Sequence, residues 1–220
     1  HSPDQPFWPA ASIVEPCLES VRELSVLGAR GANGEIECYE VAELGFSETD
    51  NILETVVSPA NISDRLRDTA LAIGHRALSR LEGAGVFAIE LFLTDDGTLL
   101  INEISPRVHN SGHHTLESAE TSQFEQHLRA VVGLPLGSTL QPQTSVMLNL
   151  LYQNEFDGKF PNDAVTDRSK AATVVHWYGK RNSKTGRKVG HITSVAQTSD
   201  AALTLARDAL KELQVETGIG

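Results

Sequence analysis

The sequence predicts an α+β fold in which most strands run antiparallel. Asn33-Gly34 and Asp96-Gly97 each stand between strand-like runs, and such dipeptides form the tight turns that join antiparallel neighbours. Apolar residues recur at helical spacing within residues 62–81. Short strand-like runs follow residue 143. Strands that are connected by hairpins pair antiparallel, so we expect mixed sheet and helix without a parallel core.

Size and charge narrow the classes of function. The chain has 220 residues, of which 40% are hydrophobic, enough for one large domain or two small ones with a real core. Its net charge of −11 argues against nucleic acid and anionic membranes as partners. The two cysteines, Cys17 and Cys38, fit reduced thiols. No apolar stretch is long enough to span a membrane, and no signal peptide is visible. We expect a cytoplasmic protein and, since the chain starts at His1, a fragment or a processed chain.

The first third of the chain is expected to be irregular and then rich in strands. Residues 1–10 contain several prolines and form an irregular lead-in, and residues 11–15 form a short strand. Residues 22–41 form a hairpin around Asn33-Gly34. A helix follows over residues 62–81, capped by Asn61 or Ser63 and ended by Gly83 and Gly85. Its buried stripe is Ile62, Leu66, Ala70, Ile73, Ala77 and Leu81.

A second hairpin places two glutamates opposite each other. In AIELFLTDDGTLLINEIS, residues 88–105, a two-residue turn at Asp96-Gly97 sets Glu90 opposite Glu103. The same face carries Phe92 and Ile101. Facing like charges destabilise a strand pair by up to about 1 kcal/mol. A shared proton or a bridging divalent cation such as Mg²⁺ would offset the repulsion. The alternative is a surface hairpin with a register off by one and both glutamates in water.

The loop after Glu103 concentrates polar side chains. It contains Arg107, His109, Asn110, Ser111, His113 and His114. Such a cluster at a strand end suits an anion or a reacting group, although a solvated loop would carry the same residues. Zinc bound by the three histidines is a further alternative, but Ser111-Gly112 disfavours the helix that it needs. A second helix is expected over residues 115–132, stopped by Gly133 and Pro135.

The character of the chain changes at residues 136–143, where we place a domain boundary. Strands are expected at residues 145–152, 171–179 and 189–197, and a helix at residues 200–213 with Ala202, Leu205, Ala209 and Leu213 buried. The loop 180–188 carries Lys180, Arg181, Lys184, Arg187 and Lys188. A basic, glycine-containing loop between strands suits a phosphate monoester, whereas the alternative is an ordinary solvated hairpin tip.

Three stretches together resemble the N5-carboxyaminoimidazole ribonucleotide synthetases, which are ATP-grasp ligases of de novo purine biosynthesis. They are residues 12–31, 85–137 and 176–192. The resemblance covers nearly the whole chain in order, and NEISPRVHNSGHHT, residues 102–115, is highly specific. It implies the C-terminal part of such an enzyme, with half of an ATP-grasp domain in residues 1–137 and a small β-rich domain in residues 138–220.

The resemblance implies an ATP and metal site. Glu90 and Glu103 match Mg²⁺-binding glutamates, with Mn²⁺ as a possible substitute, and this would offset their repulsion. Asn102 matches a nucleotide contact, Glu23 the carboxylate that contacts the ribose, and VEPCL the strand that meets adenine. The implied ATP-binding residues are therefore Glu15, Pro16, Cys17, Leu18, Glu23, Asn102 and Glu103.

The resemblance also implies the reaction. Bicarbonate attacks the γ-phosphate of ATP to give carboxyphosphate, and the amine of 5-aminoimidazole ribonucleotide captures its carboxyl carbon, which forms a C–N bond on the route to IMP. Arg107 and His109 match catalytic residues, Arg107 to stabilise carboxyphosphate and His109 to orient the amine or relay its proton. The implied substrate-binding residues are Arg107, His109, Asn110, Ser111, Lys180 and Arg187.

Two departures from the family pattern qualify these expectations. Phe46 stands where the family usually has a histidine that contacts the nucleotide. The family's N-terminal parts, a Rossmann-like domain and the phosphate-covering lid, have no counterpart here, so we expect them in cis or in trans and expect isolated residues 1–220 to be inactive. The family implies a homodimer. The alternatives are a non-catalytic nucleotide-binding or interaction module, and another ATP-grasp carboxylase or ligase.

Overall fold

The computed structural model describes residues 13–18, 21–47, 51–152, 172–180 and 184–217. The elements in these residues are β1 (Arg22–Arg30), β2 (Ile36–Cys38), β3 (Ala42–Phe46), β4 (Leu53–Ser58), α1 (Asp64–Arg80), β5 (Gly85–Leu93), β6 (Leu99–Ser105), the 3-10 helix η1 (Asn110–Gly112), α2 (Thr115–Ser118), α3 (Gln123–Val132), β7 (Thr144–Leu151), β8 (Thr173–Trp177), β9 (Lys188–Ala196) and α4 (Ser199–Thr217). The expected lead-in at residues 1–10 and part of the basic loop, residues 181–183, lie outside the described residues.

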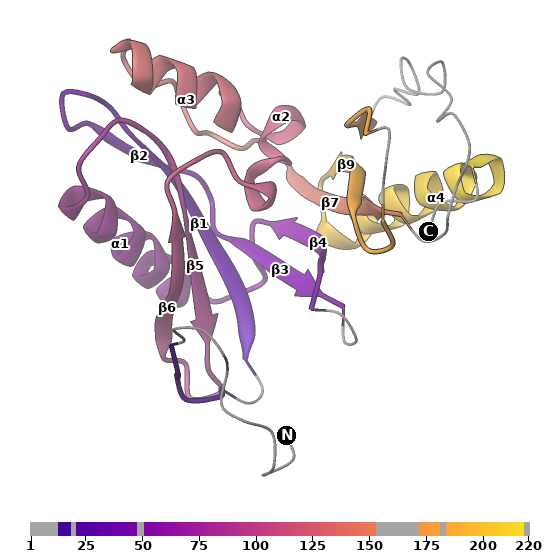
Figure 1. The fold of residues 1–220 in the computed structure, drawn as a ribbon, viewed down its shortest axis with the longest axis horizontal. Coiled ribbons are helices and arrows are strands. Elements are labelled where there is room, and N and C mark those ends of the chain that lie inside the picture. Colours follow the sequence, from indigo (N-terminus) through magenta and orange to yellow (C-terminus); the bar gives the residue numbers. More distant parts are fainter. Residues whose placement is uncertain (1–12, 19–20, 48–50, 153–171, 181–183, 218–220) are drawn as a thin grey trace.

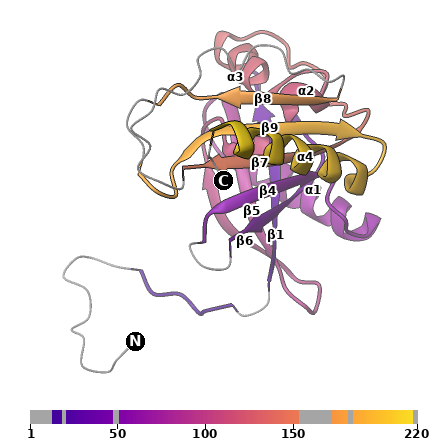
Figure 2. The ribbon, with the colours of Figure 1, turned by 90° about the vertical axis from the view of Figure 1, so that its right-hand side faces the viewer.

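A sheet with helices packed against its faces makes up the described part of the chain, which confirms the predicted α+β class. The strands form a nine-stranded sheet in the order β6-β5-β1-β3-β4-β7-β9-β8, with β2 beside β1. Every pairing given for these strands is antiparallel. Figure 1 shows α1 and α3 on opposite sides of β1 and β5, and Figure 2 shows α4 across β7 and β9.

The two faces of β1 and β5 differ in polarity. Leu24, Val26 and Ile89 point toward α1 and are fully buried in one apolar cluster. Successive side chains on a strand alternate between faces, so Ser25 and Glu90 point to the other side, where they are paired across the two strands. The apolar face toward α1 holds the strands in place, whereas the opposite face is polar at Ser25 and Glu90 and carries a second apolar cluster farther along the same strands.

The sheet continues across the expected domain boundary. β4 and β7 pair with Thr55 opposite Leu148, although the boundary placed at residues 136–143 separates these strands in sequence. The apolar clusters remain separate, since β7, β9 and α4 share one cluster and β1, β5 and α1 share another. Whether residues 1–137 and 138–220 fold as two units stays a prediction. In space they form one wall.

The predicted strand at residues 11–15 is wrong over the residues that the structure describes. Residues 13–18 form no strand and are exposed along their whole length. The apolar pair Ile13-Val14 suggested a buried strand, but both side chains lie in solvent. Within the expected hairpin at residues 22–41, the second strand is also shorter than predicted, because β2 ends at Cys38.

The predicted single helix at residues 115–132 is also wrong, because two helices occupy this segment. α2 ends at Ser118, and the next residue, Ala119, has an extended ψ of 152°. α3 then starts afresh after Ser122, whose hydroxyl accepts a hydrogen bond from Glu125 N. Ser122 and Glu125 have the spacing of a capping box, which marks a new helix start and would have revealed the break. The helix α1 was predicted well, including Ser63 as its cap.

None of the helices in the described part of the chain is both long enough and apolar enough to cross a membrane.

The close packing of α1 on β1 gives a test of the fold. A Cβ added at Gly74 would lie 2.5 Å from Val26 Cγ1, so the helix reaches the strand only because residue 74 lacks a side chain. We expect Gly74→Ala to destabilise the protein by about 1–3 kcal/mol through overpacking, although alanine favours the helix by about 1 kcal/mol. The measurement is the urea-unfolding midpoint. Thr69→Ala, at an exposed position on the same helix, should change stability by less than about 0.5 kcal/mol. Stabilisation by Gly74→Ala would contradict this account.

Candidate functional site: a carboxylate pair beneath a polar loop

Glu90 on β5 lies directly opposite Glu103 on β6, which confirms the predicted pairing. The predicted two-residue turn, however, is wrong. Leu93 pairs with Leu99, and Thr94 lies opposite Thr98. Residues 95–97 therefore form a three-residue loop, in which Gly97 takes the left-handed conformation at φ 81°. Three-residue hairpin loops with glycine in this position are a common alternative to the two-residue turn.

A β-bulge restores the glutamate pairing. Phe92 lies opposite Leu100 and not, as predicted, opposite Ile101, because the longer turn shifts the register by one. Asn102 is then the extra residue on β6, since Ile101 pairs with Leu91 while the next pair is formed by the two glutamates. The turn and the bulge compensate each other. The register predicted from a two-residue turn therefore holds for the glutamate pair but not for the residues between Asn102 and the turn.

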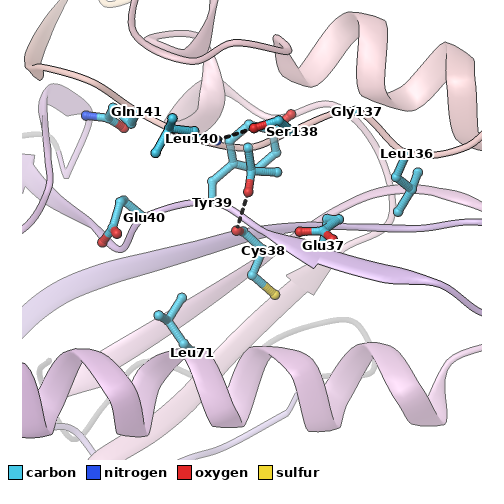
Figure 3. Close-up of a pocket in the computed structure, with 11 residues that line it drawn as sticks. Glu37, Cys38, Tyr39, Glu40, Leu71, Leu136, Gly137, Ser138, Leu140 and Gln141 are labelled. Carbon is cyan, nitrogen blue, oxygen red and sulfur yellow. Dashed lines mark hydrogen bonds between the residues drawn. The ribbon is translucent and has the colours of Figure 1, made fainter.

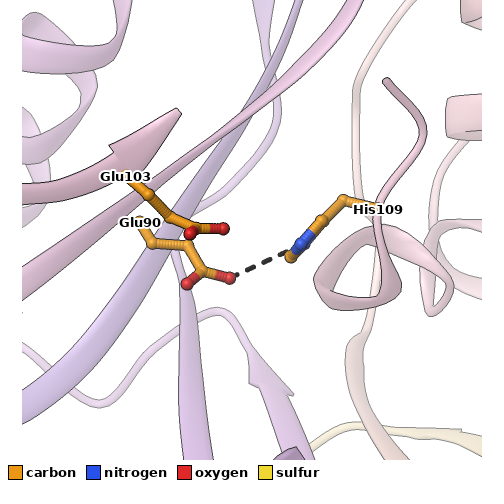
Figure 4. A group of neighbouring side chains, drawn as sticks. All are labelled: Glu90, Glu103 and His109. Carbon is orange, nitrogen blue, oxygen red and sulfur yellow. Dashed lines mark ion pairs between the residues drawn. The ribbon is translucent and has the colours of Figure 1, made fainter. Parts of the chain in front are cut away.

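The two glutamates face a histidine across a narrow gap. The candidate ligand atoms of Glu90, Glu103 and His109 all lie within 4.8 Å of one another, and among the described residues they are the group that could hold a metal ion. His109 Nδ1 lies 3.7 Å from Glu90 Oε1, as Figure 4 shows. Ser105 Oγ donates to Glu103 Oε1 at 3.3 Å. The carboxylates come from the sheet and the imidazole from the loop above it.

Electrostatics make this group a candidate cation site. Burial, together with the negative charges of Glu103 and Glu23, raises the pKa of Glu90 to about 7, and Lys188 and Arg107 only partly oppose the shift. Glu90 therefore carries its charge at a cost near neutral pH. The two carboxylates supply hard oxygen ligands, which fit Mg²⁺ or Mn²⁺, and such an ion would offset the repulsion.

The loop that carries His109 is held by buried polar side chains. Gln123 Nε2 donates to His109 O at 2.8 Å, and its Oε1 accepts from His109 N at 2.9 Å. The imidazole Nδ1 lies 2.9 Å from Ser111 Oγ, which in turn lies 2.9 Å from Ser25 Oγ on β1. The loop is thus fixed to both α3 and the sheet, so His109 is oriented before any ligand binds.

The gap opens into a cavity of about 400 Å³. It is lined by Phe46, Asn51, Ile52, Leu53, Glu90, Arg107, His109, Asn110 and Lys188. Phe46, the departure from the family pattern, is therefore part of the wall. Lys188 is a site residue that the sequence does not single out. In the sequence it stands at the end of the basic loop, but the structure places it on β9 near Glu90. Burial lowers the pKa of Lys188, and the negative charge of Glu90 raises it by a smaller amount.

The two predicted phosphate ligands lie beside this wall. Lys180 Nζ donates to the carbonyl oxygen of Lys188 at 2.6 Å and stands 5.2 Å from the Tyr178 ring centroid. Burial and the positive charge of Arg187 lower the pKa of Lys180, so the two cations are near each other. Arg187 itself is exposed. The structure thus brings Lys180, Arg187 and Lys188 to one edge of the site.

The residues predicted to contact the nucleotide do not all lie near the glutamate pair. Glu23 lies on β1 near Glu90, and burial raises its pKa. Asn102 is exposed at the bulge beside Glu103. Glu15, Pro16, Cys17 and Leu18 lie in the exposed segment 13–18, which runs outside the sheet. No described contact joins them to the glutamates, and their role in binding adenine stays a prediction.

A row of histidines links the polar loop to the strands β8 and β9. His191 stacks on His176 with ring centroids 4.5 Å apart, and lies 5.0 Å from His113. His176 Nε2 lies 2.7 Å from Glu117 Oε1 on α2. Burial lowers the pKa of His113 to about 4 and that of His191 to about 2. His114 faces Ser118 and Ser145 instead, so the described residues do not form the alternative zinc site.

A larger cavity, of about 490 Å³, lies away from the glutamates. It is lined by Glu37, Cys38, Tyr39, Glu40, Leu71, Leu136, Gly137, Ser138, Thr139, Leu140 and Gln141. Figure 3 shows it between α1 and the linker that follows α3, where Thr139 Oγ1 donates to Cys38 O at 2.9 Å. Burial raises the pKa of the Cys38 thiol to about 11, which makes it a poor nucleophile. None of the predicted site residues lies here.

Comparison with known families identifies two matching regions. Residues 5–124, more than half of the chain, match the description "ATP-grasp domain". Residues 145–204 match the description "Phosphoribosylaminoimidazole carboxylase C-terminal domain". The first region contains both glutamates and the polar loop, and the second contains the strand β9, which carries Lys188 and His191.

Individual relatives are similar over most of this chain. It is 46% identical to the chloroplastic phosphoribosylaminoimidazole carboxylase of Vigna aconitifolia, over 81% of this chain and 32% of that one. It resembles the crystal structure of N5-carboxyaminoimidazole ribonucleotide synthetase from Thermotoga maritima with a TM-score of 0.73 and 42% identity, over 86% of this chain and 51% of that one.

A second solved structure carries ligands. It is N5-carboxyaminoimidazole synthase from Aspergillus clavatus in complex with ADP and 5-aminoimidazole ribonucleotide, with a TM-score of 0.72 and 34% identity, over 83% of this chain and 48% of that one. The chain spans about a third to a half of the length of these relatives.

The buried histidines predict that acid destabilises the protein. Burial lowers the pKa of His113 and His114 to about 4 and that of His191 to about 2, against about 6.5 when unfolded. Below pH ~6.5 the unfolded chain therefore binds protons that the folded chain does not, and each histidine lowers stability by ~1.4 kcal/mol per pH unit. Glu90, whose pKa is raised to about 7, opposes one of the three. We expect unfolding free energy to fall steeply between pH 6.5 and about 4.5.

The test is urea unfolding at several pH values in a chelating buffer. His114→Gln removes one buried imidazole, so the unfolding free energy should fall by ~1.4 kcal/mol less per pH unit than in the wild type. The same substitution at His75, an exposed position on α1, should leave the slope unchanged. Equal slopes in the wild type and in His114→Gln would contradict the prediction.

Proposed function

Because the chain belongs to the ATP-grasp family, we propose that it forms one wall of the active site of an ATP-dependent N5-carboxyaminoimidazole ribonucleotide synthase. The observation that carries the proposal is the facing pair Glu90 and Glu103 at a cavity that also presents His109, Arg107 and Lys188. Relatives named for this activity, and one solved with ADP and 5-aminoimidazole ribonucleotide, support it. The activity is proposed for the complete protein, since this chain spans only about half of such relatives.

On the nucleotide side, the two carboxylates would hold Mg²⁺ or Mn²⁺ against the phosphates of ATP. The ion would neutralise the charge on the phosphates during transfer. Asn102 and Glu23, which flank the pair, would contact the nucleotide. The segment from Glu15 to Leu18 would meet adenine, which requires that this exposed segment pack against the base.

On the acceptor side, the polar loop would bind bicarbonate and the aminoimidazole ribonucleotide. An oxygen of bicarbonate attacks the γ-phosphorus, the bond to ADP breaks, and carboxyphosphate forms. The amine nitrogen then attacks the carboxyl carbon, phosphate leaves, and the amine loses a proton. Arg107 would stabilise the anionic intermediate, and Asn110 and Ser111 would help bind the substrates.

His109 suits the role of proton acceptor. Burial and the positive charges of Arg107 and Lys188 lower its pKa, so the imidazole is neutral near pH 7. A neutral imidazole can orient the attacking amine and accept its proton. Its bond to Ser111 keeps the ring in place.

Lys180 and Arg187 would hold the 5′-phosphate of the ribonucleotide, and Lys188 would add a cation to the wall between phosphate and carboxylates. The family resemblance supports two further parts of the proposal. One is an N-terminal half, in cis or in trans, that covers the nucleotide. The other is a homodimer in the cytoplasm.

The metal site gives the first test of function. Replacing Glu90 or Glu103 by Gln removes one charged ligand, so binding of Mg²⁺ with an ATP analogue to the catalytically complete protein should weaken by about 1–3 kcal/mol. Isothermal titration calorimetry measures the effect. Glu37→Gln, at the other cavity, is the matched control and should bind normally. Unchanged Mg²⁺ dependence in both site variants would refute the assignment.

The basic edge gives the second test. We expect Arg187→Ala in the complete protein to raise the KM for 5-aminoimidazole ribonucleotide by about ten- to a hundred-fold, because it removes a charge-assisted contact of roughly 1.5–3 kcal/mol. The KM for ATP should stay nearly constant. Arg187→Lys should restore only part of the loss, since a point charge cannot copy a planar fork.

Steady-state kinetics with each substrate varied in turn separates the outcomes of this second test. Arg129→Ala, which removes an ion pair with Glu125 on α3 away from the site, is the control for loss of a surface arginine. An Arg187 variant that loses ATP affinity instead, or loses nothing, would assign the loop to a different role.

A further inference from the structure

Asn149 lies behind the wall of the 400 Å³ cavity and does not line it. It belongs to β7 and is 7% exposed. Its Nδ2 donates to Leu53 O at 2.9 Å and to Asn110 Oδ1 at 2.7 Å, and its Oδ1 accepts from Asn110 Nδ2 at 3.0 Å. A primary amide has two N–H donors, so both are used. The side chain has no donor left for a ligand.

The bonds of Asn149 reach two pieces of the wall directly and a third through Asn110. Leu53 is the first residue of β4, and Asn110 opens the short helix after His109. Lys188 of β9 joins them, since its Nζ donates to Asn110 Oδ1 at 3.0 Å. One buried amide therefore holds together a strand before the polar loop, the loop itself and a strand after the linker.

These contacts fix which way the Asn110 amide points. The ammonium of Lys188 can only donate a hydrogen bond, so it requires the amide oxygen of Asn110 on its side. Asn149 requires the same orientation, because its Nδ2 already donates to that oxygen. Turning the amide over would set two donors against each other. The orientation follows from the network and not from the shape of the side chain.

The fixed amide leaves one hydrogen for a ligand. Asn110 Nδ2 carries two hydrogens, of which one is donated to Asn149. Among the described residues no acceptor is seen for the other, and Asn110 lines the cavity together with Lys188. An amide N–H beside an ammonium suits an anionic oxygen, such as that of bicarbonate or of a carboxylated substrate.

We propose that Asn149 is a positioning residue of this site, which orients Asn110 toward an anionic oxygen of the substrate and holds Lys188 beside it. The identity of that substrate rests on the proposed function. The arrangement of Asn149, Asn110 and Lys188 does not. Asn149 thereby lets the second matched region, residues 145–204, set the geometry of a loop in the first.

The test uses two variants of Asn149 in a catalytically complete protein that contains these residues. Asn149→Ser shortens the side chain and breaks the amide pair, whereas Asn149→Asp keeps the shape but loses both donors. The control is Thr193→Val, because Thr193 is fully buried on the neighbouring strand β9 and its hydroxyl has no partner among the described residues. Valine has nearly the same shape, so it should leave both kinetics and stability almost unchanged.

The first readout is kinetic. Loss of one oriented hydrogen bond corresponds to about a 3- to 10-fold effect. In both Asn149 variants we expect the KM for bicarbonate or for aminoimidazole ribonucleotide to rise by at least this factor, while the KM for ATP changes less than about 2-fold. Equal increases for all substrates, or a similar rise in Thr193→Val, would show a merely structural role and overturn the proposal.

The second readout does not depend on turnover. In the ¹H–¹⁵N spectrum of protein labelled at asparagine, the hydrogen of Asn110 Nδ2 that is donated to Asn149 should exchange slowly with solvent in the wild type and in Thr193→Val. It should exchange fast in Asn149→Ser and Asn149→Asp. Unchanged exchange in both Asn149 variants would overturn the positioning role. Absence of ribonucleotide-dependent turnover in the wild type would instead refute the proposed function, and the exchange experiment would still decide this inference.

Discussion

The facing pair of Glu90 and Glu103 is the constraint around which the rest of the site is arranged. The two carboxylates lie on paired residues of adjacent strands, and the burial of Glu90 makes its charge costlier than it would be in water. Glu23 adds a further negative charge beside the pair, whereas two cations oppose it. Lys188 and Arg107 reduce the cost of ionising Glu90 without removing it. The remaining imbalance is the reason that the pair is a candidate cation site.

Buried amide side chains hold the irregular segments around the site in place by hydrogen bonds, as apolar packing holds the strands and helices. Gln123 binds both backbone groups of His109, Gln126 binds both backbone groups of Gly137, and Asn149 binds Asn110 and Leu53. Irregular segments expose backbone groups that must find partners once they are buried. An amide, with donor and acceptor side by side, satisfies such a segment in one step. This explains why α3 turns its glutamines inward.

The sequence was most informative where chemistry depends on local pattern. The α+β class, the helix α1 with its cap Ser63 and the pairing of the two glutamates follow from spacing and turn residues over short distances. Lys188 could not be selected in this way. Its side chain reaches Glu90 only because β9 pairs with β7 and β7 with β4, which are long-range contacts without a local signature. The role of Asn149 could not be predicted for the same reason, since in the sequence it is one polar residue within a strand.

The bulge at Asn102 has a consequence for how this hairpin can change during evolution. It lies between the turn and the glutamate pair, so a residue gained or lost in the turn can be absorbed by losing or gaining the bulge. The two carboxylates would stay opposite each other through such a change. The hairpin can therefore change its turn and its bulge together without separating the two carboxylates.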